Sequence, residues 1–168
     1  MPAATVHRYL IALGSNMRHP RHRRPRAVLA AALGVLEEEG LAVLAGSPIT
    51  TSAPLGPSRR RYANAAAVIA SDLEPEPLLD LLQRIERRFG RRRRGRRWRA
   101  RVLDLDVVLW SGGPWASPRL VIPHPRFRER LFVLAPAAAI APAWRDPLTG
   151  LTMRRLKARL TRLGRLPR

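Results

Sequence analysis

The sequence predicts an α+β fold, and three observations lead to that prediction. Apolar runs with strand character and amphipathic helical patterns follow one another in the order β-α-β-β-α-β. Two further helical patterns lie near the C-terminal end. No internal repeat or long linker divides the 168 residues, so we expect one domain over residues 1–168. This order indicates a ferredoxin-like sheet with helices on one face, extended by C-terminal helical additions.

The first half of the chain supplies three expected strands and one helix. The strands are apolar runs bounded by turn-forming residues, at residues 9–13, 41–51 and 62–69, and Gly46 interrupts the second run. Between the first two, apolar residues recur near helical spacing over residues 27–39. Gly40 follows directly, where a glycine commonly ends a helix.

The second half begins with a helical pattern over residues 74–89. Pro75 and Pro77 fall in its first turn, where proline is tolerated. An apolar run over residues 102–109 predicts the next strand, and residues 110–118 have the composition of a turn. The last expected elements are a short strand at residues 120–122 and helices at residues 130–139 and 152–163.

Composition limits the class of protein. Hydrophobic residues make up 46% of the chain, which is typical of a folded domain rather than a disordered basic tail. The net charge is +20, almost all of it from arginine, and Lys157 is the only lysine. This charge predicts attraction to polyanions, so binding to nucleic acid is expected to be non-specific if it occurs. High-GC codon usage explains the arginine bias as simply as functional selection does.

Several classes of site are absent from the sequence. There is no cysteine, which excludes disulfides, thiolate nucleophiles and sulfur-based zinc sites. Walker-type, G-x-G-x-x-G and H-E-x-x-H motifs are missing as well. The N-terminus lacks the apolar core of a secretion signal, and no apolar stretch is long enough and free of proline to span a bilayer. We therefore expect a soluble, cytoplasmic protein without membrane association. The expected oligomeric state is a monomer, although no feature of the sequence determines it.

Two aspartates, Asp104 and Asp106, interrupt the apolar run at residues 102–109. Alternate residues of a strand share a face, so both carboxylates are expected on one face, with Leu103, Leu105 and Val107 on the other. Such a pair suits hard Mg²⁺, which takes one or two carboxylates and completes its shell with water and phosphate oxygens. The alternative is a solvated strand face.

An arginine-rich segment at residues 90–101 precedes this strand. Guanidinium groups match phosphate oxygens, so arginines beside a metal-binding acidic pair suggest phosphoryl transfer on a nucleotide. A solvated loop and an RNA-binding patch are the alternatives. Trp98, within the segment, can stack on a base or a pterin-like ring, or it can anchor the loop.

Two further positions have polar side chains that suit a binding site. Tyr62 and Asn64 are two residues apart on an expected strand, so they share a face. A buried asparagine needs hydrogen-bond partners and can therefore read a polar heterocycle, or it can satisfy nearby backbone. His124 stands between two prolines and is either a ligand contact or a structural surface histidine.

Short motifs follow one another along nearly the whole chain: Ile11-Ala12-Leu13-Gly14-Ser15-Asn16, Pro54-Leu55-Gly56-Pro57, Tyr62-Ala63-Asn64-Ala65, Gln83-Arg84-Ile85-Glu86, Arg101-Val102-Leu103-Asp104-Leu105-Asp106 and Pro123-His124. In this order they resemble the 6-hydroxymethyl-7,8-dihydropterin pyrophosphokinases of folate biosynthesis. One departure is Arg99-Ala100, where that family commonly has Gly-Pro, a pair that fixes loop geometry.

The resemblance implies transfer of pyrophosphate from ATP to the hydroxymethyl group of 6-hydroxymethyl-7,8-dihydropterin, with release of AMP. It implies that Asp104 and Asp106 hold a pair of Mg²⁺ ions and act in catalysis together with Arg91 and Arg101. The ATP contacts that it implies are Gln83, Arg91, Arg93, Arg101, Arg119 and His124. The pterin contacts are Ser52, Leu55, Tyr62, Asn64, Trp98 and Phe132, with Tyr62 and Phe132 on the two faces of the ring.

Two other functions compete with this interpretation. One is a small RNA-binding protein with a structural acidic pair, which the net charge of +20 favours. The other is a different Mg²⁺-dependent nucleotidyltransferase that carries a paired-aspartate strand. The Gly14-Ser15-Asn16 and Tyr62/Asn64 motifs favour the pyrophosphokinase over both.

Overall fold

The structure, a computed structural model, describes residues 5–52, 61–90 and 102–164. Within these residues, α1 and α2 each lie between strands, and the chain continues after β7 with a 3-10 turn and two helices. The elements are β1 (His7–Ser15), α1 (Pro25–Glu38), β2 (Ala42–Gly46), β3 (Thr50–Ser52), β4 (Tyr62–Ser71), α2 (Pro75–Arg88), β5 (Asp104–Trp110), β6 (Trp115–Ala116), β7 (Val121–Ile122), η1 (Phe127–Glu129), α3 (Leu131–Ile140) and α4 (Met153–Leu163).

The central sheet is antiparallel and has the strand order β2-β4-β1-β5. The short strand β3 pairs with the same strand, β4, as β2 does. Strand β1 is hydrogen-bonded on both sides, and this pairing extends it beyond the expected residues 9–13. Strands β6 and β7 form a separate small hairpin, and β7 packs against β5.

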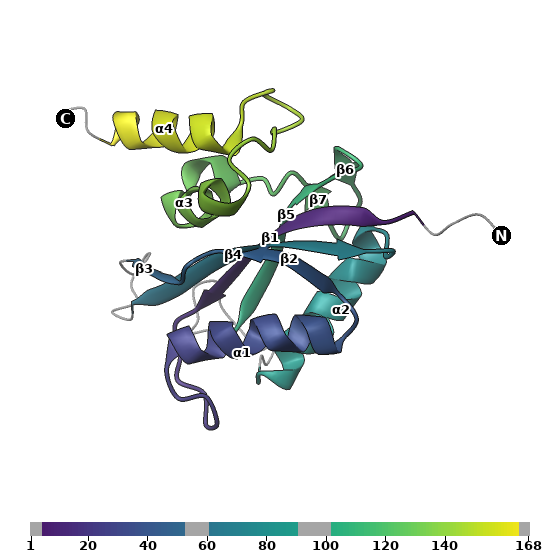
Figure 1. The fold of residues 1–168 in the computed structure, drawn as a ribbon, viewed down its shortest axis with the longest axis vertical. Coiled ribbons are helices and arrows are strands. Elements are labelled where there is room, and N and C mark those ends of the chain that lie inside the picture. The colour runs from purple at the N-terminus through teal and green to yellow at the C-terminus, as the bar shows by residue number, and fades with distance from the viewer. Residues whose placement is uncertain (1–4, 53–60, 91–101, 165–168) are drawn as a thin grey trace.

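Helices cover both faces of the sheet (Figure 1). Helices α1 and α2 bury apolar residues on one face, against side chains that include Ile11, Ile69 and Leu105. Helices α3 and α4 lie on the opposite face, where Leu10 and Val68 belong to a second apolar cluster. Helix α3 is apolar on all sides because it is packed between the sheet and α4, as is usual for an interior helix.

Strand β5 confirms the alternation expected from the sequence. Leu103, Leu105 and Val107 are buried in the cluster beneath α1 and α2. Asp104 and Asp106 are half-buried and therefore lie on the other face, the one that α3 and α4 share. The acidic pair is thus presented on a single face of an otherwise buried strand.

Two local predictions are wrong. Residues 41–51 form two strands instead of one, because Pro48 has no N–H with which to continue the ladder. At this break the Ser47 hydroxyl accepts the Ala66 N–H at 2.9 Å in place of a backbone carbonyl. The expected turn at residues 110–118 contains β6, which pairs with β7.

Helix α1 ends where the sequence predicted. Gly40 adopts φ +87°, a conformation that favours glycine, directly after the last turn. The Gly40 N–H donates to Glu37 O and the Leu41 N–H donates to Leu36 O, both at 3.0 Å. These bonds satisfy carbonyls at the helix end, and Leu36 and Leu41 are both buried in the core.

None of the helices in the described part of the chain combines the length and apolar character needed to cross a membrane.

A buried ion pair ties the segment after α3 to η1. Asp146 is 0% exposed and accepts two hydrogen bonds from the Arg128 guanidinium, both at 2.7 Å. It also accepts the Thr149 hydroxyl at 2.6 Å and the Leu148 N–H at 3.1 Å. Burial alone would raise the pKa of Asp146, but the hydrogen bonds from Arg128, Thr149 and Leu148 outweigh it and hold the pKa below the ordinary value.

We predict that Asp146→Asn lowers the free energy of unfolding at neutral pH by about 3 kcal/mol, because Arg128 then remains partly buried without its counter-charge. The contribution of Asp146 should be fully present above its unfolded pKa, near 4, and should be lost as the pH falls through the lower folded pKa. Urea unfolding at a series of pH values measures both effects.

Glu39→Gln serves as the control, because it breaks an ion pair with Arg88 on the exposed surface. It should change stability little. Equal losses for the two variants would contradict a special role for the buried pair.

Candidate active site

A row of three residues crosses the sheet at one end of β1. Gly14 is paired directly with Asn64 on β4 and with Asp104 on β5. Directly paired residues share a face, so the amide and the carboxylate stand on the same side of the sheet with a glycine between them. Neighbouring strands are about 4.8 Å apart, which separates the Asn64 and Asp104 backbones by roughly 10 Å.

Gly14 keeps the space between these two side chains open. A Cβ at this position would lie 3.9 Å from Asn64 Oδ1, and no other atom of the described residues lies within 4 Å of it apart from its chain neighbours. In the next row, Ala12 is paired with Ala66 and Asp106, so the residue beside the second aspartate is small as well. The result is a low floor of small residues flanked by an amide on one side and two carboxylates on the other.

Asn64 is 4% exposed, and its side chain is oriented by hydrogen bonding. Its Nδ2 donates to the Ser52 hydroxyl at 2.8 Å across the β3–β4 pair. Ser52 is paired in turn with Tyr62, which lies on the same face as Asn64. The structure therefore brings together three residues of the predicted pterin set.

Phe132 approaches the same face of the sheet from the first turn of α3. It is partly buried against the apolar cluster there, and α3 also contacts β3. The Arg130 guanidinium lies 5.8 Å from the centre of its ring. The other two predicted pterin residues, Leu55 and Trp98, lie outside the described residues.

His124 stands beside the acidic pair. Its backbone N–H donates to Val108 O on β5 at 3.0 Å, which holds the segment after β7 against that strand. Its ring Nε2 lies 4.0 Å from Asp106 Oδ2, and its Nδ1 accepts the Arg126 N–H at 3.1 Å. Burial lowers the pKa of His124 and the Arg130 charge lowers it further, while Asp104 acts in the opposite direction. The ring is thus expected to be neutral near pH 7, with its proton on Nε2 facing Asp106.

Glu86 belongs to one of the motifs that carry the resemblance, but the sequence analysis predicted no role for it. Its carboxylate is buried on α2 and accepts the Leu105 N–H at 2.8 Å, between the two aspartates on β5. This bond fixes the strand that carries the acidic pair. The sequence signal for this role was the position of Glu86. It follows Ile85 on the apolar side of a helical pattern, where a charged residue is unexpected unless it has a buried partner.

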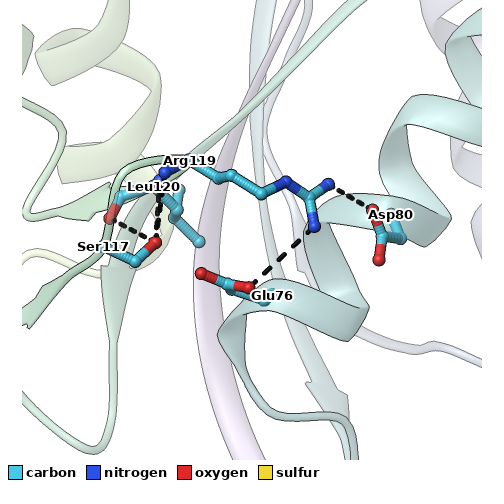
Figure 2. Close-up of polar contacts among 5 residues, drawn as sticks. All are labelled: Glu76, Asp80, Ser117, Arg119 and Leu120. Carbon is cyan, nitrogen blue, oxygen red and sulfur yellow. Dashed lines mark hydrogen bonds and ion pairs between the residues drawn. The ribbon is translucent and has the colours of Figure 1, made fainter.

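Arg119, predicted to contact ATP, is engaged with α2 (Figure 2). Its guanidinium forms an ion pair with Asp80, and its Nη1 lies 3.9 Å from Glu76 Oε2. The Ser117 hydroxyl accepts the Arg119 and Leu120 N–H groups, which shapes the turn between β6 and β7. The Arg119 and Asp80 side chains are 47% and 49% exposed, so their pair is weak and can exchange for a phosphate.

Gln83, another predicted ATP contact, lies on α2 three residues after Asp80, so the two share a side of the helix. Gln83 on α2 and Arg119, which is paired with Asp80 of α2, therefore lie at the same helix. Helix α2 packs on the sheet face opposite the acidic pair, so the helix that carries Gln83 and pairs with Arg119 is separated from Asp104 and Asp106 by the sheet. Arg91, Arg93 and Arg101 lie outside the described residues.

The donor set of Asp104 and Asp106 fits Mg²⁺. Two carboxylates on one face, one of them with a 40% exposed side chain, leave room for the water and phosphate oxygens that this ion retains. The described residues contain no cluster of three or more His, Cys, Asp or Glu side chains arranged for a metal. An ion held by these two carboxylates would complete its shell with water or substrate oxygens, as Mg²⁺ in phosphoryl-transfer sites does.

The sequence profile of the 7,8-dihydro-6-hydroxymethylpterin-pyrophosphokinase (HPPK) family matches residues 10–142. The chain belongs to this family. The match begins in β1 and ends directly after α3, so it contains every described site residue and leaves out α4.

Individual relatives agree with this assignment. The 2-amino-4-hydroxy-6-hydroxymethyldihydropteridine pyrophosphokinase of Pseudomonas aeruginosa is 40% identical over 144 residues, covering 84% of this chain and 85% of that protein. The enzyme of the same name from Bacillus subtilis is 38% identical over 133 residues, covering 77% and 75%. A folate synthesis bifunctional protein of Arabidopsis thaliana is 34% identical, but the match covers only 27% of its length.

Solved structures support the fold. A crystal structure of a Plasmodium falciparum HPPK-DHPS triple mutant superposes with a TM-score of 0.75 at 12% identity. The match covers 98% of this chain and 46% of that one, so the chain spans under half the length of this structural relative. At this identity the likeness establishes the arrangement of strands and helices and nothing about ligands.

We predict that His124 in the metal-free protein titrates below 6.5, the ordinary histidine value, because burial and Arg130 disfavour its charged form. Arg130→Gln should raise this pKa, because Arg130 lowers it more than Arg126 does. NMR titration of the imidazole carbons measures both values. Arg145→Gln is the control and should leave the His124 titration unchanged; a wild-type pKa above the ordinary value would contradict the prediction.

Proposed function

We propose that this chain is a Mg²⁺-dependent pyrophosphokinase that transfers pyrophosphate from ATP to 6-hydroxymethyl-7,8-dihydropterin and releases AMP in folate biosynthesis. One observation carries the proposal beyond family membership. Asn64 and Asp104 flank Gly14 in a single row of the sheet, so a residue suited to a polar heterocycle and a residue suited to a metal face the same open floor.

In this proposal the pterin lies over Gly14. The Asn64 amide, oriented by Ser52, hydrogen-bonds the polar edge of the ring, and the Tyr62 and Phe132 rings contact its faces. The roughly 10 Å between the Asn64 and Asp104 strands matches the span of a bicyclic ring with its hydroxymethyl arm. The ring edge and the reacting hydroxyl are then held at opposite ends of the floor.

Asp104 and Asp106 would hold a pair of Mg²⁺ ions. Bound there, such ions would lower the pKa of the attacking hydroxyl and offset the phosphate charge. Because AMP leaves, the bond that breaks joins the β-phosphorus to the oxygen that bridges it to the α-phosphorus, and the new bond joins the pterin oxygen to the β-phosphorus. Glu86 keeps the aspartates in place through the Leu105 N–H.

The nucleotide is assigned to the arginines and to His124. Neutral His124 donates from Nε2, and Arg119 exchanges Asp80 for phosphate oxygens. Arg91 and Arg101 neutralise charge that grows on the leaving oxygen, and Arg93 and Gln83 complete the ATP set. Such a reaction depends on positioning and electrostatics more than on covalent catalysis.

We assign the core of the fold to the ferredoxin-like class. If β2 and β3 are counted as one strand, the order β2-β4-β1-β5 with crossover helices α1 and α2 corresponds to a βαββαβ unit. Helices α3 and α4 are then additions on the opposite face. We further propose that the chain is a cytoplasmic enzyme with a single domain and that it acts as a monomer.

The decisive experiment measures AMP release from ATP by the purified protein with Mg²⁺, with and without the reduced pterin. Pterin-dependent AMP release in equal amounts with pterin pyrophosphate supports the proposal. AMP release that is the same with and without the pterin would indicate a different nucleotidyltransferase. No AMP release under either condition would contradict the proposed activity.

We predict that Asp104→Asn and Asp106→Asn each lower turnover by at least about 10³-fold, since several kcal/mol of charge stabilisation depend on the metal ligands. The melting temperature should hold or rise slightly, because like charges on one strand face repel. Asp72→Asn is the matched control, an exposed aspartate away from the row. Near wild-type turnover at saturating Mg²⁺ in either site variant would disprove the metal role.

We predict that Asn64→Ala weakens pterin binding about 10- to 100-fold and leaves binding of an ATP analogue within about twofold, because one buried hydrogen-bonding partner is removed. Calorimetric titration with each ligand separately measures the two affinities. Ser52→Ala should show the same preference with a smaller effect, since Ser52 only orients the amide. Equal weakening of both ligands would point to a folding defect.

A further inference from the structure

The outward surface of α4 is strongly basic. Its cationic side chains are all exposed, and the helix contains no carboxylate; they are Arg154, Arg155, Lys157, Arg159 and Arg162. No hydrogen bond or ion pair of the described residues joins any of these five cationic groups to an acid. This surface, the α4 basic face, is therefore a concentration of uncompensated positive charge.

These cationic side chains do not stabilise α4. Arg154 and Arg155 occupy the first turn, where the helix dipole disfavours cations, and no acid is present there. Arg155 and Arg159 are four residues apart, a spacing at which like charges destabilise a helix. The helix is held instead by Met153 and Leu156, which are buried against α3, and by the Thr152 hydroxyl, which accepts the Arg155 N–H at 3.3 Å.

The α4 basic face is also separate from the candidate active site. The family match ends at residue 142, before α4 begins. Helix α3 lies between α4 and the sheet (Figure 1), so α4 does not reach the row of Asn64, Gly14 and Asp104. Neither the proposed reaction nor family membership accounts for this surface.

We infer that the α4 basic face binds the phosphodiester backbone of nucleic acid. Guanidinium groups bind phosphate oxygens in a bidentate manner, and four of the five cations are arginines. The helix rises 1.5 Å per residue, so Arg154 to Arg162 span about 12 Å. Successive phosphates of a nucleic-acid strand are a few ångströms apart, about 3.4 Å along the axis in duplex DNA, so this length of helix can face several phosphates of a single strand as well.

An anionic membrane fits less well. Helices that lie in the membrane interface insert an apolar side among the lipids. In α4 that side carries Met153 and Leu156, and both are already buried against α3. Leu160 is partly buried as well, and Leu163 at the end of α4 is the one large apolar side chain of this helix that is mostly exposed. The remaining surface of α4 is dominated by charge, which matches a polyanion in water better than the interior of a bilayer.

Fluorescence anisotropy with a short labelled single-stranded RNA of mixed sequence, titrated at a series of salt concentrations, tests the inference. Contacts from all five cations would give a slope of log K against log salt of about −3.5. Arg155→Gln/Arg159→Gln should make the slope shallower by about 1.4, because two phosphate contacts are lost. Pterin-dependent AMP release should stay at the wild-type level, which separates this result from the outcome for the proposed function.

Arg84→Gln/Arg88→Gln is the matched control: it removes the same charge at the same spacing from α2, where Arg88 already has acidic partners. It should retain the wild-type slope. Circular dichroism checks folding, and Arg159→Gln/Arg162→Gln replaces the first α4 variant if that variant does not fold. The inference fails if the wild-type protein does not bind RNA at low salt, if the α4 variants bind like wild type, or if the control loses as much. Binding to phosphatidylserine vesicles with none to RNA would also overturn it.

Discussion

The pairing of β1 with both of its neighbours is the constraint on which the candidate site depends. Gly14 meets Asn64 on one side and Asp104 on the other only because both registers are set against the same strand. A slip of one residue on either side would turn the amide or the carboxylate to the opposite face. The buried residues of β1, which pack against α1 and α2 on one face and α3 on the other, hold these registers.

Buried polar groups keep the surrounding segments in place. Glu86 fixes β5 at Leu105, and the His124 backbone is bonded to Val108 on the same strand. Further along the chain, Asp146 binds Arg128 on η1, directly before the first turn of α3. Each contact joins segments distant in sequence, and each buried polar atom would carry a desolvation cost without its partner. The geometry around the acidic pair is therefore supported by residues that need not touch a substrate.

The cationic side chains of this highly basic chain differ in whether a carboxylate balances them. Arg119 is balanced by carboxylates on α2, and Arg128 is balanced inside the fold by Asp146. Within the described residues the cations on α4 have no such partners, and they lie outside the family match. The arginines that make up the net charge of +20 therefore differ in their surroundings. Only the acidic side chains in contact with each arginine distinguish one that is free to bind phosphate from one that stabilises the fold.

Local sequence alone determined the order of elements and the shared face of Asp104 and Asp106, because strand alternation and helical periodicity are properties of neighbouring residues. The motif resemblance identified Asn64 and Ser52, which the structure joins by a hydrogen bond. Only the tertiary structure decided that α3 and α4 cover the face opposite α1 and α2, that Pro48 divides an expected strand, and that Glu86 supports β5. These features depend on contacts between residues far apart in the chain. Local sequence patterns do not specify which distant residue a buried side chain will contact.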